Sequence, residues 1–222
     1  MKNRTRYILL PCTIILFFHA NNLLADQSSE TISLTPESFE HIQFKRITPS
    51  KYTFDSGVLK ADVDGSSSIL MMPFESVKTV NQVNFEWRSS GMPEVKDAEY
   101  EATKQGDDAV VKVGLLLKAD ETSFNPFAPK WLKRVNELLV FPSENMVYLV
   151  ADAKHAVGDD WISPYNKRIL MVPVSSKQGD DDWYKSVHQL EQPLEVVAIW
   201  IMADGDNTNS QFTSYIKNLH IK

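Results

Sequence analysis

Cysteine is almost absent from this sequence, since Cys12 is the only one among 222 residues. It lies in an apolar N-terminal segment that we expect to be removed, so the mature chain has no disulfide and no thiolate. A cysteine nucleophile and a thiolate metal site are therefore both excluded. The stability of the fold must come from an ordinary hydrophobic core, and the chain is long enough to form one sizeable domain around it.

Long apolar runs are also missing beyond the N-terminus. Basic residues precede the apolar run Tyr7 to Phe18, which has the length of a secretory signal and is too short to span a membrane. Ala25 supplies a small residue for cleavage. We therefore expect residues 1–25 to be a cleaved signal peptide and the mature protein to be periplasmic or secreted, and not membrane-spanning. A lipoprotein signal at Cys12 is the competing interpretation, but Pro11 is a poor residue directly before such a cut.

Positive charge is in deficit. The chain has 23 Lys and Arg residues against 29 Asp and Glu residues, which gives a net charge of −6 at pH 7. Loss of the signal makes the protein more acidic, because that segment carries basic residues and no acidic ones. Nucleic acids and anionic membranes are bound through Lys and Arg, so the composition argues against both as partners. Solubility is the simplest reason for the excess of acid.

The signatures of several enzyme classes are absent as well. The sequence has no glycine-rich phosphate loop, no Gly-x-Ser-x-Gly, no His-Glu-x-x-His and no Cys-x-x-Cys. The histidines outside the signal are far apart and show no metal-ligand spacing: His41, His155, His188 and His220. Hydride transfer, phosphoryl transfer and zinc hydrolysis therefore have no support.

What the sequence does contain is a succession of short strand patterns. Val83, Phe85 and Trp87 alternate with polar residues, as in a half-buried strand, and turn signals such as Asp55-Ser56-Gly57 separate one pattern from the next. A further strand is favoured over a helix at residues 183–190. The other expected strands cover residues 52–54, 58–63, 67–72, 80–89, 109–118, 146–151, 168–174, 196–203 and 212–219.

One helix is expected, opening at Ala128-Pro129. Trp131, Val135 and Leu138 then fall on one face of it. Many short antiparallel strands with one short helix predict a mostly β fold, a two-sheet antiparallel β-sandwich of the jelly-roll type. We expect it to form a single domain over residues 39–222, after a flexible lead-in over residues 26–38.

Two acidic turns lie at the ends of expected strands. A buried strand runs directly into Asp204, Asp206 and Asn207, and a second begins directly after Asp107 and Asp108. If the fold brings the turns together, these side chains can bind a polar ligand. Calcium prefers several oxygen ligands, and Asp107, Asp204 and Asp206 are the set that it would use. The alternative is a purely structural role, because Asp, Gly and Asn form turns for backbone reasons.

A loop with two aromatic residues is a further candidate. Trp161 and Tyr165 flank Ser163-Pro164, close to carboxylates. An aromatic ring can stack on the C–H face of a sugar while polar groups bind its hydroxyls. The alternative is that the two rings cap the core. Arg88 alternates to the face opposite Trp87, where it is either solvated or paired with an acidic turn.

These segments resemble the bacterial domain of unknown function 3047, a group of secreted or periplasmic proteins. The run Ile201 to Thr208 is similar to the family's closing signature, and Gly106-Asp107-Asp108 is similar to its turn before a strand. The resemblance covers about Phe39 to Lys222, and Asn209 stands where the family has a glycine. It implies an exported jelly-roll of the carbohydrate-binding type, and the family carries no established activity.

We interpret the chain as an exported, non-catalytic binding module for a glycan or another polyhydroxylated ligand of the cell envelope. One alternative is a structural or interaction protein of the envelope that binds no small ligand. The other is a glycan-cleaving enzyme that uses a pair of Asp residues, but catalysis would need one acid with a raised pKa at a fixed distance from the second carboxylate. A non-enzyme is favoured.

Overall fold

The computed structural model describes residues 29–121 and 127–222. The predicted signal peptide, residues 1–25, lies outside these ranges. The strands are β1 Glu30–Thr31, β2 Glu40–Gln43, β3 Lys51–Asp55, β4 Val58–Asp64, β5 Ser68–Ser90, β6 Ala109–Lys118, β7 Ser143–Ala151, β8 Trp161–Ile162, β9 Ile169–Val174, β10 Ser176–Gln178, β11 Tyr184–Asp204 and β12 Gln211–Ile221. The helices are α1 Ala98–Glu101 and α2 Lys130–Leu138, and Pro36–Ser38 forms a turn of 3-10 helix.

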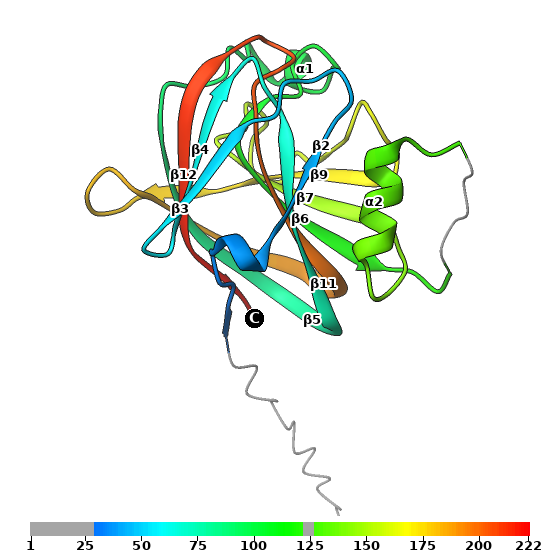
Figure 1. The fold of residues 1–222 in the computed structure, drawn as a ribbon. Coiled ribbons are helices and arrows are strands. Elements are labelled where there is room, and N and C mark those ends of the chain that lie inside the picture. Colours follow the sequence, from blue (N-terminus) through cyan, green and yellow to red (C-terminus); the bar gives the residue numbers. More distant parts are fainter. Residues whose placement is uncertain (1–28, 122–126) are drawn as a thin grey trace, which may run out of the picture.

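Two long strands, β5 and β11, organise the sandwich. They pair antiparallel over most of their length, with register shifts between Gln189 and Leu194 and between Val196 and Ala198. On one side of these irregularities the two strands belong to a layer that also contains β12, β4 and β3. On the other side they belong to a second layer that also contains β2, β6, β7 and β9. The hydrogen-bonded ladder is therefore continuous, in the order β3-β4-β12-β5-β11-β6-β7-β9-β8, and the two long strands carry it through both layers (Figure 1).

The main core lies between the two layers. Phe85, Leu59 and Ile216 point into it from one layer, and Leu115 and Leu149 from the other. All five are almost fully buried. Burial of such side chains stabilises each by about 1.5–3 kcal/mol, so this interface dominates the stability of the fold.

Helix α2 covers the layer of β2, β6, β7 and β9 on the face that points away from the main core. Its residue Trp131 packs edge-on against Trp200 of β11 and Phe44, with ring centroids 6.4 and 5.5 Å apart. Figure 1 shows α2 on one side of the molecule and β3, β4 and β12 on the other. We call the layer under α2 the covered layer, and the layer of β3, β4, β12 and the adjoining parts of β5 and β11 the open layer. In the part of the chain that the structure describes, no helix lies over the outer face of the open layer. Along β4 and β12, buried residues that face the core alternate with more accessible residues on this outer face.

The structure confirms the predicted mostly β sandwich and the predicted helix, and it also differs from the sequence interpretation in several elements. The strands expected at residues 67–72 and 80–89 are one continuous strand, β5, and the strand expected at 196–203 is the end of β11. The short helix α1 was not expected. Among the described residues, no helix is both long and apolar enough to cross a membrane.

The described part of the expected lead-in is packed against the sandwich. β1 pairs with the end of β12, and the backbone N–H of Ile32 donates to the carbonyl of Leu219. Ile32 and Leu34 are 2% and 5% exposed. Their alternate spacing turns both apolar side chains toward the core, so the chain from Ser29 onward forms part of the domain that was expected to begin at residue 39.

Candidate functional site

The two acidic turns, whose meeting the sequence left open, lie side by side. Asp204 is the last residue of β11 and stands opposite Ala109, the first residue of β6. Asp107 and Asp108, which directly precede β6, therefore meet the turn that follows β11. The antiparallel pairing of two strands that are far apart in the sequence creates this acidic cluster.

A buried lysine at the centre of the cluster was not foreseen. Lys112 of β6 is 3% exposed. Its Nζ donates to Asp107 Oδ1 at 2.8 Å, to the Asp107 carbonyl at 2.9 Å and to Asp204 Oδ2 at 3.0 Å. A lysine inside the otherwise apolar run Ala109 to Leu117 is the signal that could have revealed it, because such a charge is almost never buried without a partner.

Burial and charge act against each other at this lysine. Burial alone would lower the pKa of Lys112, but the carboxylates of Asp107 and Asp204 outweigh it and raise the pKa. The lysine therefore stays charged at neutral pH. Burial raises the pKa of Asp107, while Lys112 opposes that shift.

Asp204 has the most perturbed carboxyl group. Burial raises its pKa well above the ordinary value, Lys112 opposes the shift, and Asp108 and the nearby Asp206 add to it. Asp204 Oδ1 is buried with no hydrogen-bond donor, whereas Oδ2 accepts from Lys112. A proton on Oδ1 would give this oxygen a partner in the Asp206 carboxylate.

Asp108 fixes the turn after β11. Its Oδ1 accepts from the backbone and side-chain nitrogens of Asn207 at 3.2 and 3.0 Å, and its Oδ2 accepts from the backbone nitrogen and hydroxyl of Thr208 at 2.7 and 2.6 Å. Asn209 takes the left-handed conformation, with φ of 53°, a conformation that asparagine tolerates better than most residues. Asp108 is 2% exposed and all four of these bonds are internal.

Oxygens for a cation are present, although in a different set from the one predicted. Carboxylate oxygens of Asp108, Asp204 and Asp206 lie within 4.8 Å of one another. This spacing is about twice the calcium–oxygen bond length, so three such atoms can reach one ion. Asp107, which the sequence placed in the calcium set, is instead paired with Lys112. Calcium binding stays a prediction.

The predicted aromatic loop is divided between core and surface. Trp161 is 8% exposed and stacks on His155, with ring centroids 4.0 Å apart. Tyr165 is 55% exposed, and its hydroxyl donates to Asn207 Oδ1 at 2.5 Å. The structure therefore brings Tyr165 to the acidic cluster, but it does not bring Arg88 there, because Arg88 lies on the outer face of the open layer.

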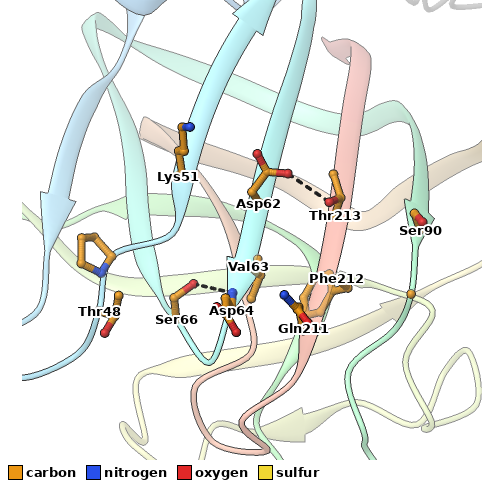
Figure 2. Close-up of a pocket in the computed structure, with 12 residues that line it drawn as sticks. Thr48, Lys51, Asp62, Val63, Asp64, Ser66, Ser90, Gln211, Phe212 and Thr213 are labelled. Carbon is orange, nitrogen blue, oxygen red and sulfur yellow. Dashed lines mark hydrogen bonds between the residues drawn. The ribbon is translucent and has the colours of Figure 1, made fainter.

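A polar groove of about 730 Å³ crosses that outer face. Lys51, Asp62, Thr213 and Ser90 stand in cross-strand register on β3, β4, β12 and β5, so their side chains form one row (Figure 2). Thr213 Oγ1 donates to Asp62 Oδ1 at 3.0 Å. The groove is lined by both turn and strand residues: Thr48, Pro49, Lys51, Asp62, Val63, Asp64, Ser66, Ser90, Gly91, Gln211, Phe212 and Thr213.

The next row along the same strands carries aromatic and cationic groups. Lys60 pairs in register with Tyr215, and Tyr215 pairs with Arg88. Trp183, which directly precedes β11, lies on the far side of Arg88. The Arg88 guanidinium carbon is 4.6 Å from the Tyr215 ring centroid and 4.9 Å from that of Trp183.

Electrostatics inside the groove favours ionised groups. Lys60 and Thr213 donate hydrogen bonds to Asp62. The bond from Lys60 lowers the pKa of Asp62 below its ordinary value, and Asp62 in turn raises the pKa of Lys60. Asp62 therefore acts as a hydrogen-bond acceptor at neutral pH. A carboxylate of this kind cannot donate a proton to a leaving group.

Fold and surface together define a β-sandwich with a solvent-facing groove on its open layer; its strands pair antiparallel, as expected, except that β7 and β9 pair parallel. The chain belongs to the family described as protein of unknown function (DUF3047), whose model matches residues 37–220. A comparison with curated proteins finds no match.

The solved structures that this chain matches include carbohydrate-binding modules. A mutant of a family 29 carbohydrate-binding module is 11% identical and has a TM-score of 0.39, and the match covers 88% of this chain and 91% of that one. A second family 29 mutant is also 11% identical, with a TM-score of 0.38 and coverage of 87% and 90%. A low-affinity xylan-binding module from Roseburia intestinalis is 9% identical, with a TM-score of 0.34 and coverage of 87% and 92%.

Proposed function

We propose that this protein binds a glycan without cleaving it, through the groove on the outer face of the open layer. The observation that carries the proposal is the row formed by Lys51, Asp62, Thr213 and Ser90 on four adjacent strands. Polar groups of both donor and acceptor type at fixed spacing match a polyhydroxylated ligand. Neighbouring strands lie about 4.8 Å apart, so the row offers contacts over more than one sugar ring.

The size of the groove fits this function. Its volume of about 730 Å³ lies within the range of small-molecule binding sites. Strand residues position its polar groups, and Asp64 and Gln211, which pair in register, extend the polar row toward the turns. A site on paired strands is rigid, which limits the ordering cost of binding.

Binding is favoured over hydrolysis by the charge state of the groove. Hydrolysis of a glycosidic bond needs a carboxylic acid with a raised pKa. The pKa of Asp62 is lowered by Lys60, and the two carboxyl groups with raised pKa described above, Asp107 and Asp204, are buried in the acidic cluster. The groove therefore has hydrogen-bonding groups suited to holding a glycan.

Calorimetry of the purified protein with a panel of oligosaccharides tests the proposal. We expect at least one oligosaccharide to bind, and we expect the double variant Asp62→Asn, Gln211→Ala to weaken that binding about tenfold or more, because charged hydrogen bonds contribute about 1.5–3 kcal/mol. Asp55→Asn is the matched control, because Asp55 is an exposed carboxylate at the far end of the same hairpin.

A third variant distinguishes the groove from the acidic cluster. Asp206→Asn removes a partly exposed carboxylate from the site that the sequence predicts. Loss of binding in this variant, with Asp62→Asn, Gln211→Ala unaffected, would move the site to the cluster. If no oligosaccharide binds, the proposal fails and the structural or interaction role becomes the better account.

A further inference from the structure

Arg88 is held in one orientation on the outer face of the open layer. It projects from β5 between Tyr215, its cross-strand neighbour on β12, and Trp183, which directly precedes β11. The guanidinium lies 4.6 and 4.9 Å from the centroids of these two rings. A planar cation that stacks on aromatic rings loses little further freedom when it binds a ligand.

The hydrogen-bonding capacity of Arg88 is unused. Among the described residues, its guanidinium makes no hydrogen bond and no ion pair, and Nε is buried without a partner. An arginine carries five N–H donors, and a buried donor without a partner costs free energy. In a chain with 29 acidic and 23 basic residues, an arginine without an acidic partner is unexpected.

The carboxylates closest to it in register are already paired. Glu86, two residues before Arg88 on the same face, lies 3.4 Å from Lys217 Nζ. Asp62 lies 2.9 Å from Lys60 Nζ. Lys217 Nζ also lies 4.0 Å from the centroid of the Trp183 ring. Among the described residues, Arg88 therefore has no carboxylate partner on this face, and its N–H donors are free.

The geometry points to an acidic oligosaccharide, and we propose that Arg88 binds the carboxylate of a uronic acid unit in it. This inference rests on the proposed glycan-binding function. The guanidinium fork matches a carboxylate with two parallel hydrogen bonds. Ser90 of the groove is two residues farther along β5, or about 7 Å away, which places the carboxylate site next to the groups that would bind neutral hydroxyls.

The local balance of charge limits the ligand to isolated carboxylates. Lys51, Lys60, Arg88 and Lys217 are interspersed with Asp62, Asp64 and Glu86 on this face. A densely charged polyanion would meet those acidic side chains, so it would be repelled as well as attracted. A sugar acid with one carboxylate per ring can place that group on Arg88 and its hydroxyls in the groove.

Calorimetry with matched probes tests this inference. The probes are tetragalacturonate and a tetrameric mannuronate, each with its carboxyl-reduced counterpart, together with xylotetraose, cellotetraose and mannotetraose. We expect an acidic tetramer to bind about tenfold or more tightly than its reduced form. The variant Arg88→Lys keeps the charge but loses the fork, so it should remove this preference. Arg134→Lys, in an exposed arginine of α2, is the matched control and should leave it unchanged.

Each other outcome overturns the inference in a distinct way. If neutral tetramers bind as well as acidic ones, the carboxylate site is wrong and the proposed glycan binding stands. If a sulfated xylotetraose binds as tightly as the acidic tetramer, the assignment to a carboxylate is wrong. If Arg88→Lys keeps the preference and an unchanged melting temperature, the site is not at Arg88. If nothing in the set binds, both this inference and the proposed function fail.

Discussion

At the scale of single residues, Lys112 links the two acidic turns. It is buried and bonded to Asp107 and Asp204, which come from strands far apart in the sequence. Loss of one partner from a buried ion pair leaves a buried charge without compensation, and this is more costly than loss of the pair's own attraction. The cluster therefore contributes to the integrity of the fold, in addition to any contact it makes with a ligand.

The variant Lys112→Met tests that structural role. We expect it to lower the free energy of unfolding by about 3–5 kcal/mol, because two buried carboxyl groups lose their only cation. Urea unfolding followed by tryptophan fluorescence measures the change. Lys118→Met is the matched control, since Lys118 lies at the exposed end of the same strand and pairs with Glu195 at 3.2 Å. That variant should lose less than about 1 kcal/mol. Equal effects of the two substitutions would contradict the role of the cluster.

The raised pKa of Asp204 predicts a pH dependence with a definite sign. The folded chain holds a proton on Asp204 at pH values at which the unfolded chain has lost it. This group therefore contributes to stability below its ordinary pKa, and the contribution is lost as pH rises through the raised pKa of the folded state. Asp204→Asn cannot ionise, so its free energy of unfolding should rise relative to that of the wild type as the pH increases above the ordinary pKa of aspartate.

Unfolding by urea at several pH values, with a calcium chelator present, measures that difference. The chelator removes any contribution of a bound cation to the wild type, and repeating the series with calcium reveals one. Parallel curves for the two proteins in chelator would show that Asp204 titrates alike in the folded and unfolded states.

At the scale of elements, the strand patterns predicted the sheet well but not its continuity. The hairpin of β3 and β4, strand β6 and helix α2 lie within a few residues of their expected positions. Strands 67–72 and 80–89 were expected to be separate, yet β5 runs through both. The intervening residues have no alternation of their own, and their extended conformation is imposed by pairing with β11, including the register shifts at which both strands change layer.

The binding face is also a property of assembled elements. Arg88 was singled out from its alternation with Trp87, and that alternation is confirmed. Its neighbour Tyr215 comes from β12, and Trp183 directly precedes β11. The register of those strands placed the two rings on either side of Arg88. Cross-strand pairs of this kind follow from long-range pairing, which local sequence does not specify.

At the scale of the whole molecule, the chain from Ser29 onward behaves as one packed unit. β1 adds to the edge of the open layer at β12, and Ile32 and Leu34 are part of the main core. The lead-in interpretation relied on polar composition before residue 34, and it could not detect that two alternating apolar residues would dock on a distant strand.

A truncation tests this. A chain that begins at Pro36 should be less stable than one that begins at Ser29 by about 3 kcal/mol or more, because two buried aliphatic side chains are lost. Chemical unfolding of the two chains measures the change. Identical midpoints and slopes would instead mean that the segment is dispensable, as the sequence interpretation expected.

The sequence by itself determined the class of fold, the family and most of the strand positions. These follow from local periodicity, from turn chemistry and from composition, all of which are written in short segments. The tertiary structure alone decided what those residues do. It placed Lys112 between Asp107 and Asp204, buried Trp161 against His155, and aligned Lys51, Asp62, Thr213 and Ser90 in one groove. Such contacts depend on which distant strands pair and in which register, and burial and charge act on a side chain only after that pairing has formed.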